Sequence, residues 1–169
     1  MINASLVGLG WWGQVLTRKI NNSEKISVNS AYTRTPKNAN EFVEEMGIDL
    51  YDSYEQLLAD DGVDAVILAT PHSLHVDQIK LAGGAKKHIY VEKPIALTLS
   101  ETREAISSAR DAGVEIAVGF QRRGHPSMAA ALNAVKDGSL GRIIHVEGHQ
   151  SAPGLRIYKE GSWRQERDE

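Results

Sequence analysis

The chain has 169 residues, of which 41% are hydrophobic, which suits one well-cored globular domain and leaves too little chain for two full ones. The formal net charge of −3 and the lack of a run of like charges give no reason to expect nucleic acid or a membrane surface as partner, so we expect a small molecule. The sequence contains no cysteine, which excludes disulfides and thiolate catalysis. Because no apolar run approaches the roughly 20 residues of a membrane span and no signal peptide is evident, we expect a cytoplasmic protein.

The N-terminal segment predicts a strand, a glycine-rich turn and a helix. Residues 2–7 alternate weakly and end apolar, as a strand entering a buried sheet does. An apolar stripe at helical spacing follows, formed by Trp12, Leu16 and Ile20. Thr17 and its polar neighbours are expected on the opposite, outer face of this helix.

The turn carries the pattern G-x-G-x-x-G at Gly8, Gly10 and Gly13. Gly8 permits the tight turn, Gly10 leaves room for a pyrophosphate, and Gly13 lets the helix lie close to the strand. The helix N-terminus adds unpaired N–H groups for a phosphate. Trp12 then heads the core stripe, and Trp11, about 100° further round the helix, borders the ligand cleft. The alternative is a glycine-rich turn with two packing tryptophans.

Strand and helix signals alternate from residue 26 to residue 120, which is typical of a parallel sheet covered on both faces. The expected strands are residues 26–33, 49–51, 64–69, 88–91 and 115–120. The expected helices are residues 36–46, a helix capped by Ser53, residues 73–82, and residues 100–112 with Gly113 as the stop signal. The sequence therefore predicts an α/β, doubly wound parallel sheet of the Rossmann type over residues 1–120.

The pattern changes after Phe120. A polar linker is expected at residues 121–124, a helix at 126–135, and a strand at 143–151 that has no sheet to join. We therefore expect residues 121–169 to be the beginning of a second, α+β domain for substrate and oligomerisation that is truncated. The apolar side chains of its strand should promote self-association into homo-oligomers; they are Ile143, Ile144 and Val146.

Polar or glycine residues follow each of several strands of the predicted sheet. They occupy residues 8–13, 33–34, 70–75, 92–94 and 120–123. In doubly wound sheets, ligands bind beyond the carboxyl ends of the strands. The five segments together therefore indicate a nucleotide site more strongly than the glycine pattern does alone.

The end of the second strand distinguishes between the nicotinamide cofactors. An NAD-selective site usually has Asp or Glu about 20 residues beyond the glycines, whereas here Thr33 is followed by Arg34. The missing carboxylate removes repulsion against a 2′-phosphate, and Arg34 can add a charge-assisted hydrogen bond worth about 1.5–3 kcal/mol. The sequence thus favours NADP over NAD, unless Arg34 merely solvates the surface.

Lys93 is the most prominent candidate for chemistry, because it follows an apolar strand, precedes a proline and neighbours Glu92. A buried lysine can have a lowered pKa and transfer a proton or hold a substrate hydroxyl. The alternative is a Glu92–Lys93 ion pair. His72 and His75 lack a third ligand at suitable spacing, so we expect no metal site and interpret His75 as a polar wall of the cofactor cleft.

Taken together, these residues resemble the Gfo/Idh/MocA oxidoreductases, the family of glucose-fructose oxidoreductase and inositol dehydrogenase. The matching stretches, in the family's order and spacing, are GLGWWG, DAVILATPHSLH, HIYVEKPIALT, VGFQRRGHP and LGRIIHVEGH. The resemblance implies an NAD(P)-dependent dehydrogenase or reductase that passes a hydride between nicotinamide and a sugar, cyclitol or related polyol substrate.

The resemblance also implies a set of cofactor contacts. The pyrophosphate would be cradled by Gly8, Gly10, Trp11, Trp12 and Gly13. The adenosine ribose would meet Thr33 and Arg34, and the dinucleotide would pass beside Thr70, Pro71 and His75. The nicotinamide ribose and the substrate would be reached by Glu92 and Lys93, with Lys93 as the catalytic lysine. Further contacts with the cofactor would come from Gln121, Trp163 and Arg164.

Members of this family are longer and continue into a large open sheet that carries the substrate pocket and a catalytic Asp and His. Lys93 would here lack those acid/base partners. We favour the truncated cofactor-binding portion of a sugar-type oxidoreductase, with little turnover alone. The alternatives are a non-enzymatic dinucleotide-sensing module that binds other proteins and a stand-alone short reductase.

Overall fold

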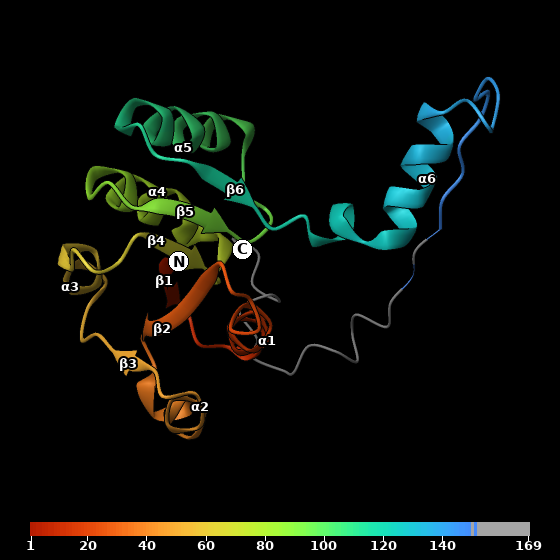
Figure 1. Ribbon diagram of the computed structural model, residues 1–169. Coiled ribbons are helices and arrows are strands. Elements are labelled where there is room, and N and C mark those ends of the chain that lie inside the picture. Colours follow the sequence, from red (N-terminus) through yellow and green to blue (C-terminus); the bar gives the residue numbers. More distant parts are fainter. Residues whose placement is uncertain (150, 152–169) are drawn as a thin grey trace. The chain divides into compact units, whose positions relative to one another are not determined.

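The computed structural model describes residues 1–149 and 151, and its first part is a parallel sheet between two layers of helices (Figure 1). Met1–Gly119 form one compact unit, and a second unit begins at Phe120. The sheet has six parallel strands in the order β3-β2-β1-β4-β5-β6. They are β1 (Ile2–Val7), β2 (Ile26–Tyr32), β3 (Asp49–Leu50), β4 (Ala65–Leu68), β5 (His88–Val91) and β6 (Ile116–Val118). This strand order is that of the Rossmann sheet, and it confirms the predicted α/β fold.

Helices cover both faces of this sheet (Figure 1). One face packs against α1 (Trp11–Ile20) and α2 (Asn40–Met46). The other packs against α3 (Tyr54–Ala59), α4 (His75–Gly84) and α5 (Leu99–Ala112). The middle of the sheet buries mainly apolar side chains because helices cover both faces there; Leu6, Val28, Val66 and Leu68 are fully buried. No helix in the described part of the chain is long and apolar enough to span a bilayer.

Helix α1 lies close against β1 because Gly13 has no side chain. A Cβ at Gly13 would stand 2.1 Å from the carbonyl oxygen of Gly8. One turn further on, Thr17 is also fully buried, and its hydroxyl donates a hydrogen bond of 3.1 Å to the Gly13 carbonyl. The prediction of Thr17 on the outer face was therefore wrong, because this bond to the preceding turn satisfies its hydroxyl inside the core.

The predicted apolar stripe of α1 is only partly correct. Leu16 and Ile20 pack against the core on this face of the sheet. Trp12 is partly buried but belongs to neither core, so it does not head the stripe as expected.

Two expected helices begin differently from the prediction. The helix expected at residues 36–46 is divided into a 3-10 helix, Pro36–Asn38, and α2. Ala39 lies between them with φ −124° and ψ 0°, and it is buried together with Phe42. The chain leaves the helical path there because Ala39 turns into the core. The helix expected from residue 73 likewise begins as a 3-10 helix, His72–Leu74, before α4.

Helix α5 starts from a capping box that connects it to the segment after β5. The Thr98 side chain accepts a hydrogen bond from the Glu101 backbone N–H, and the Glu101 carboxylate accepts one from the Thr98 N–H. Two backbone donors of the first turn are thereby satisfied. Gly113, with φ +72°, ends the helix as predicted.

The second unit contains a 3-10 helix, Gln121–Gly124, where a linker was expected, and α6 (Pro126–Lys136), which confirms the predicted helix. The strand predicted at 143–151 is not formed at the described positions 143–149 and 151. Among the described residues no strand offers its backbone groups for pairing there, and Ile144 and Val146 are 85% and 81% exposed. Self-association through these side chains stays a prediction.

We expect the Gly13→Ala variant to lose about 1–3 kcal/mol of unfolding free energy, because its methyl group would overlap the backbone of the glycine turn. Gly84→Ala is the matched control, since a Cβ at that position of α4 meets nothing within 4 Å. The control should be neutral, or stabilising by up to about 1 kcal/mol. Urea unfolding followed by circular dichroism measures both variants, and equal unfolding midpoints would contradict the packing account.

Candidate functional site

The predicted site lies at the point where the strand order of the sheet reverses. The chain leaves β1 toward α1 on one face and leaves β4 toward α4 on the other face. Gly8 follows β1 with φ +97°, and a Cβ there would stand 2.7 Å from the Ala69 carbonyl oxygen, directly after β4. The two segments therefore touch through their backbones, at the crevice where ligands of doubly wound sheets bind.

Gly10 differs from the other two glycines of the turn. It precedes α1 with φ −67° and ψ 175°, a conformation that any residue can adopt. A Cβ at Gly10 would meet nothing within 4 Å. Neither backbone strain nor packing against the described residues therefore requires glycine here. The open space lies at the N-terminus of α1, a ten-residue helix with no side-chain cap and no acidic residue in its first turn, which suits an anion.

Two aromatic rings follow this open space. Trp11 is 75% exposed, and its ring centroid lies 5.5 Å from that of the partly buried Trp12, with 43° between the ring planes. The Trp12 indole N–H is buried and has no hydrogen-bond partner among the described residues. Trp11 thus offers a flat apolar surface to a ligand, whereas contact of either ring with a pyrophosphate stays a prediction.

The end of β2 lies beside the glycine turn, because the Gly8 N–H donates a 2.8 Å hydrogen bond to the Tyr32 carbonyl. The Thr33 hydroxyl accepts from the Thr35 N–H at 3.5 Å. Arg34 is exposed and forms no ion pair with any described residue. Its guanidinium is therefore available to an anionic group that approaches this end of the sheet.

His75 connects the segments that follow β4 and β5. It is fully buried, with Nε2 3.1 Å from the Thr70 carbonyl oxygen and Nδ1 2.8 Å from the Pro94 carbonyl oxygen. The expected polar wall is therefore wrong in one respect: His75 lies beneath the two loops and exposes no surface. A contact of His75 with a cofactor stays a prediction.

The rest of the segment after β4 is hydrogen-bonded to α4. The Thr70 hydroxyl donates a 2.6 Å hydrogen bond to the Gln78 side-chain oxygen, and Pro71 precedes the 3-10 helix that leads into α4. The His72 ring stands edge-on to His75 at 5.7 Å. Within the described ranges, no three His, Cys, Asp or Glu side chains are grouped so as to hold a metal.

Glu92 and Lys93 follow β5 and have opposite environments. Glu92 is 7% exposed, and its carboxylate oxygens lie 3.4 Å from the Tyr90 hydroxyl and 3.4 Å from the Lys93 backbone N–H. Lys93 is exposed, two residues beyond the end of β5 at Val91, so the interpretation as a buried lysine does not apply. The alternative ion pair is also not formed between these two described residues.

Three residues of this region were missed from the sequence. Gln78 accepts a hydrogen bond from Thr70, and Tyr90 donates one to Glu92. Gly119 makes room for Glu92, because a Cβ at Gly119 would stand 2.6 Å from a Glu92 carboxylate oxygen. The strand period of two places Tyr90 on the same face as Glu92, which is a signal that could have identified it. No sequence pattern connects Gln78 with Thr70 across eight positions.

Three predicted contacts belong to other parts of the chain. Gln121 is exposed in the first turn of the second unit. Trp163 and Arg164 lie outside the described residues. Their contacts with a cofactor stay predictions.

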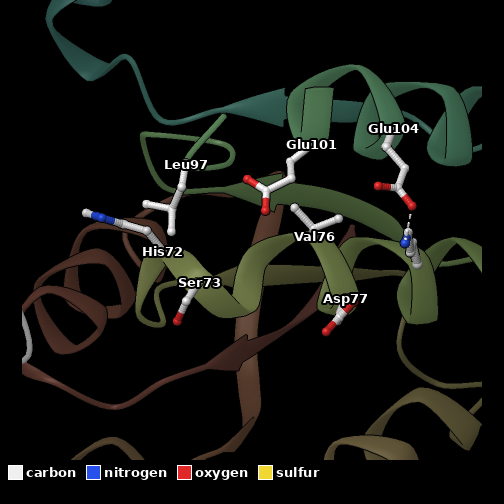
Figure 2. Close-up of a pocket in the computed structure, with 8 residues that line it drawn as sticks. His72, Ser73, Val76, Asp77, Leu97, Glu101 and Glu104 are labelled. Carbon is white, nitrogen blue, oxygen red and sulfur yellow. Dashed lines mark ion pairs between the residues drawn. The ribbon is translucent and has the colours of Figure 1, made fainter. Parts of the chain in front are cut away.

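A groove of about 230 Å³ lies between α4 and α5 (Figure 2). Its lining residues are His72, Ser73, Val76, Asp77, Lys80, Leu97, Glu101 and Glu104. Three carboxylates and one ammonium group are among these residues, and that ammonium group, on Lys80, is paired with Glu104. An anionic dinucleotide would be repelled by this groove, so the glycine turn is the better site for it.

Comparison with known proteins gives a consistent result. The family model described as an oxidoreductase family with an NAD-binding Rossmann fold, Gfo/Idh/MocA, matches residues 2–120. The chain is 39% identical over 126 residues to scyllo-inositol 2-dehydrogenase (NAD(+)) of Bacillus subtilis, covering 72% of this chain and 36% of that protein. It is 35% identical over 120 residues to D-xylose 1-dehydrogenase (NADP(+)) 2 of Haloferax volcanii, covering 70% and 37%.

A solved structure agrees with these sequence matches. Scyllo-inositol dehydrogenase of Lactobacillus casei, crystallised with NAD(H) and scyllo-inositol, superimposes with a TM-score of 0.78 at 27% identity. The match covers 85% of this chain and 43% of that one, so the chain spans less than half the length of these relatives. The chain therefore belongs to the Gfo/Idh/MocA oxidoreductase family, whose NAD-binding Rossmann fold it contains.

Proposed function

We propose that the chain binds a nicotinamide dinucleotide along the carboxyl edge of its sheet, with NADP preferred over NAD. Gly10 carries this proposal. Its backbone conformation is ordinary and its missing side chain leaves open space at the N-terminus of α1, so a ligand that approaches the backbone explains the glycine. The residues present therefore fit the pyrophosphate of such a cofactor.

Charge and position support one direction for the dinucleotide. The adenosine end would lie at Thr33 and Arg34, beyond β2, and the nicotinamide end toward Glu92 and Lys93, beyond β5. The relatives do not decide between the cofactors, because one is named for NAD(+) and another for NADP(+). The exposed Arg34, with Thr33 where NAD-selective sites carry a carboxylate, supports NADP.

The proposed activity is hydride transfer between this cofactor and a sugar, cyclitol or related polyol substrate. A bound nicotinamide would supply or accept the hydride. Lys93 would hold or release a proton at Nζ beside the reacting oxygen, and its exposed position leaves that atom accessible to a substrate. Support comes from the relatives, which are named for scyllo-inositol and D-xylose.

The Arg34→Ala variant should bind NADPH about tenfold or more weakly than the unchanged chain, as expected for the loss of one charge-assisted hydrogen bond. Binding of NADH, which has no 2′-phosphate, should change little. Isothermal titration calorimetry with each cofactor measures both affinities. Arg103→Ala, which removes an exposed arginine from α5, is the matched control.

Two results would count against this proposal in different ways. If the unchanged chain bound NADPH and NADH equally and Arg34→Ala altered neither affinity, the preference for NADP would be wrong. If neither cofactor bound at millimolar concentration, the dinucleotide site itself would be wrong.

The Gly10→Ala variant separates ligand binding from folding. Its methyl group would meet no atom of the described residues within 4 Å, so the unfolding free energy should change by less than about 1 kcal/mol. The same methyl group occupies the space proposed for the pyrophosphate, so NADPH affinity should fall by about tenfold or more. Urea unfolding and calorimetry provide the two readouts. If the folded variant bound NADPH with unchanged affinity, the pyrophosphate would not lie at Gly10.

A further inference from the structure

Tyr90 and Glu92 form a pair at the end of β5, next to Gly119, in which Glu92 is buried and Tyr90 is half-buried. The Tyr90 hydroxyl lies 3.4 Å from one carboxylate oxygen of Glu92, and its ring packs against the core on the α1 face. A Cβ at Gly119 would stand 2.6 Å from the same carboxylate and 2.8 Å from the hydroxyl. The absence of a side chain at Gly119 therefore makes room for the pair.

The backbone around this pair is fixed by the sheet. The Glu92 N–H donates to the Leu68 carbonyl at 2.9 Å, and the Gly119 N–H donates to the Val91 carbonyl at 2.8 Å. Because the backbone is fixed, the orientation of the Glu92 carboxylate depends on its side-chain contacts. Its two contacts, with Tyr90 and with the Lys93 N–H, are both 3.4 Å long.

The Glu92 carboxylate has acceptor capacity to spare. A carboxylate offers about four acceptor positions, and two long contacts leave some of these unused. Glu92 is only 7% exposed, so water satisfies it poorly, and a hydroxyl donor from a ligand would improve its hydrogen bonding. Burial and the adjacent negative charge of Glu92 raise the pKa of Tyr90 to about 12, so its hydroxyl keeps its proton and donates to Glu92.

We propose that Tyr90 is a positioning residue of the dinucleotide site, which orients the Glu92 carboxylate to accept a hydrogen bond from a ribose hydroxyl on the nicotinamide side. This rests on the proposed function. Tyr90 acts through Glu92 and does not touch the cofactor itself. The hydroxyl of Tyr90, and not its ring, carries the effect.

The test is a double-mutant cycle with Tyr90→Phe and Glu92→Gln, read out as the calorimetric affinity for NADPH. Tyr90→Phe keeps the ring and removes the hydroxyl, and should weaken binding by about three- to tenfold. In the Glu92→Gln background the same change should have a smaller effect, because the uncharged amide oxygen accepts the Tyr90 hydrogen bond more weakly than the carboxylate does. Tyr51→Phe is the matched control; it removes a hydroxyl that donates to Asp60 instead.

A ligand fragment adds a second readout. Adenosine 2′,5′-bisphosphate lacks the nicotinamide half, so Tyr90→Phe should leave its affinity unchanged. A weaker affinity for both ligands would indicate a general structural disturbance and overturn the positioning role. If Tyr90→Phe does not fold, Gly119→Ala, which displaces the pair by steric contact, takes its place in the cycle and should show the same selective loss.

The two proposals fail in distinguishable ways. An unchanged chain that binds neither NADPH nor NADH overturns the proposed function, and the role of Tyr90 with it. An unchanged chain that binds NADPH, together with a Tyr90→Phe variant that binds it equally well, overturns only the role of Tyr90. A loss that persists in full in the Glu92→Gln background shows that Tyr90 does not act through Glu92.

Discussion

The structure depends on backbone contact at the centre of the sheet, where β1 and β4 lie side by side and their connections part to opposite faces. Gly8 touches the Ala69 carbonyl, and Gly13 brings α1 against Gly8. Two contacts of this closeness leave the turn little freedom to rearrange. These contacts also fix the position of Gly10, the third glycine, at the N-terminus of α1. Packing in the core therefore preforms the proposed ligand site.

The segments after β4 and β5 are also fixed by contacts with residues packed beneath them. His75 connects the carbonyl groups of Thr70 and Pro94, and Tyr90 reaches Glu92 from within the sheet. These residues are buried or partly buried, while Arg34 and Lys93, which are placed to meet charged or reacting groups, are exposed. Buried residues that fix the backbone beneath exposed side chains favour a preformed ligand site.

Local sequence patterns were sufficient to predict the strands of the sheet, because glycine, proline and apolar periodicity influence the structure of only a few neighbouring residues. They placed all six strands of the sheet within one or two residues. The errors arose where individual side-chain contacts decide, because apolar periodicity does not register them. Thr17 is buried because its hydroxyl donates to the Gly13 carbonyl one turn back, and Lys93 lies exposed beyond the end of β5 at Val91. Residues 143–149 alternate like a strand but have no described strand to pair with. Tyr90 was missed because the space for its hydroxyl depends on Gly119, which follows β6 and is distant from it in the sequence.

The central claim, that a dinucleotide lies across the glycine turn and the segments after β4 and β5, is tested most directly by nuclear magnetic resonance of the ¹⁵N-labelled chain titrated with NADPH. The account predicts amide shifts concentrated at residues 8–13, Thr70 and Glu92, from three separate parts of the sequence that meet at one edge of the sheet. Shifts centred instead on the groove between α4 and α5, around Asp77 and Glu101, would contradict it.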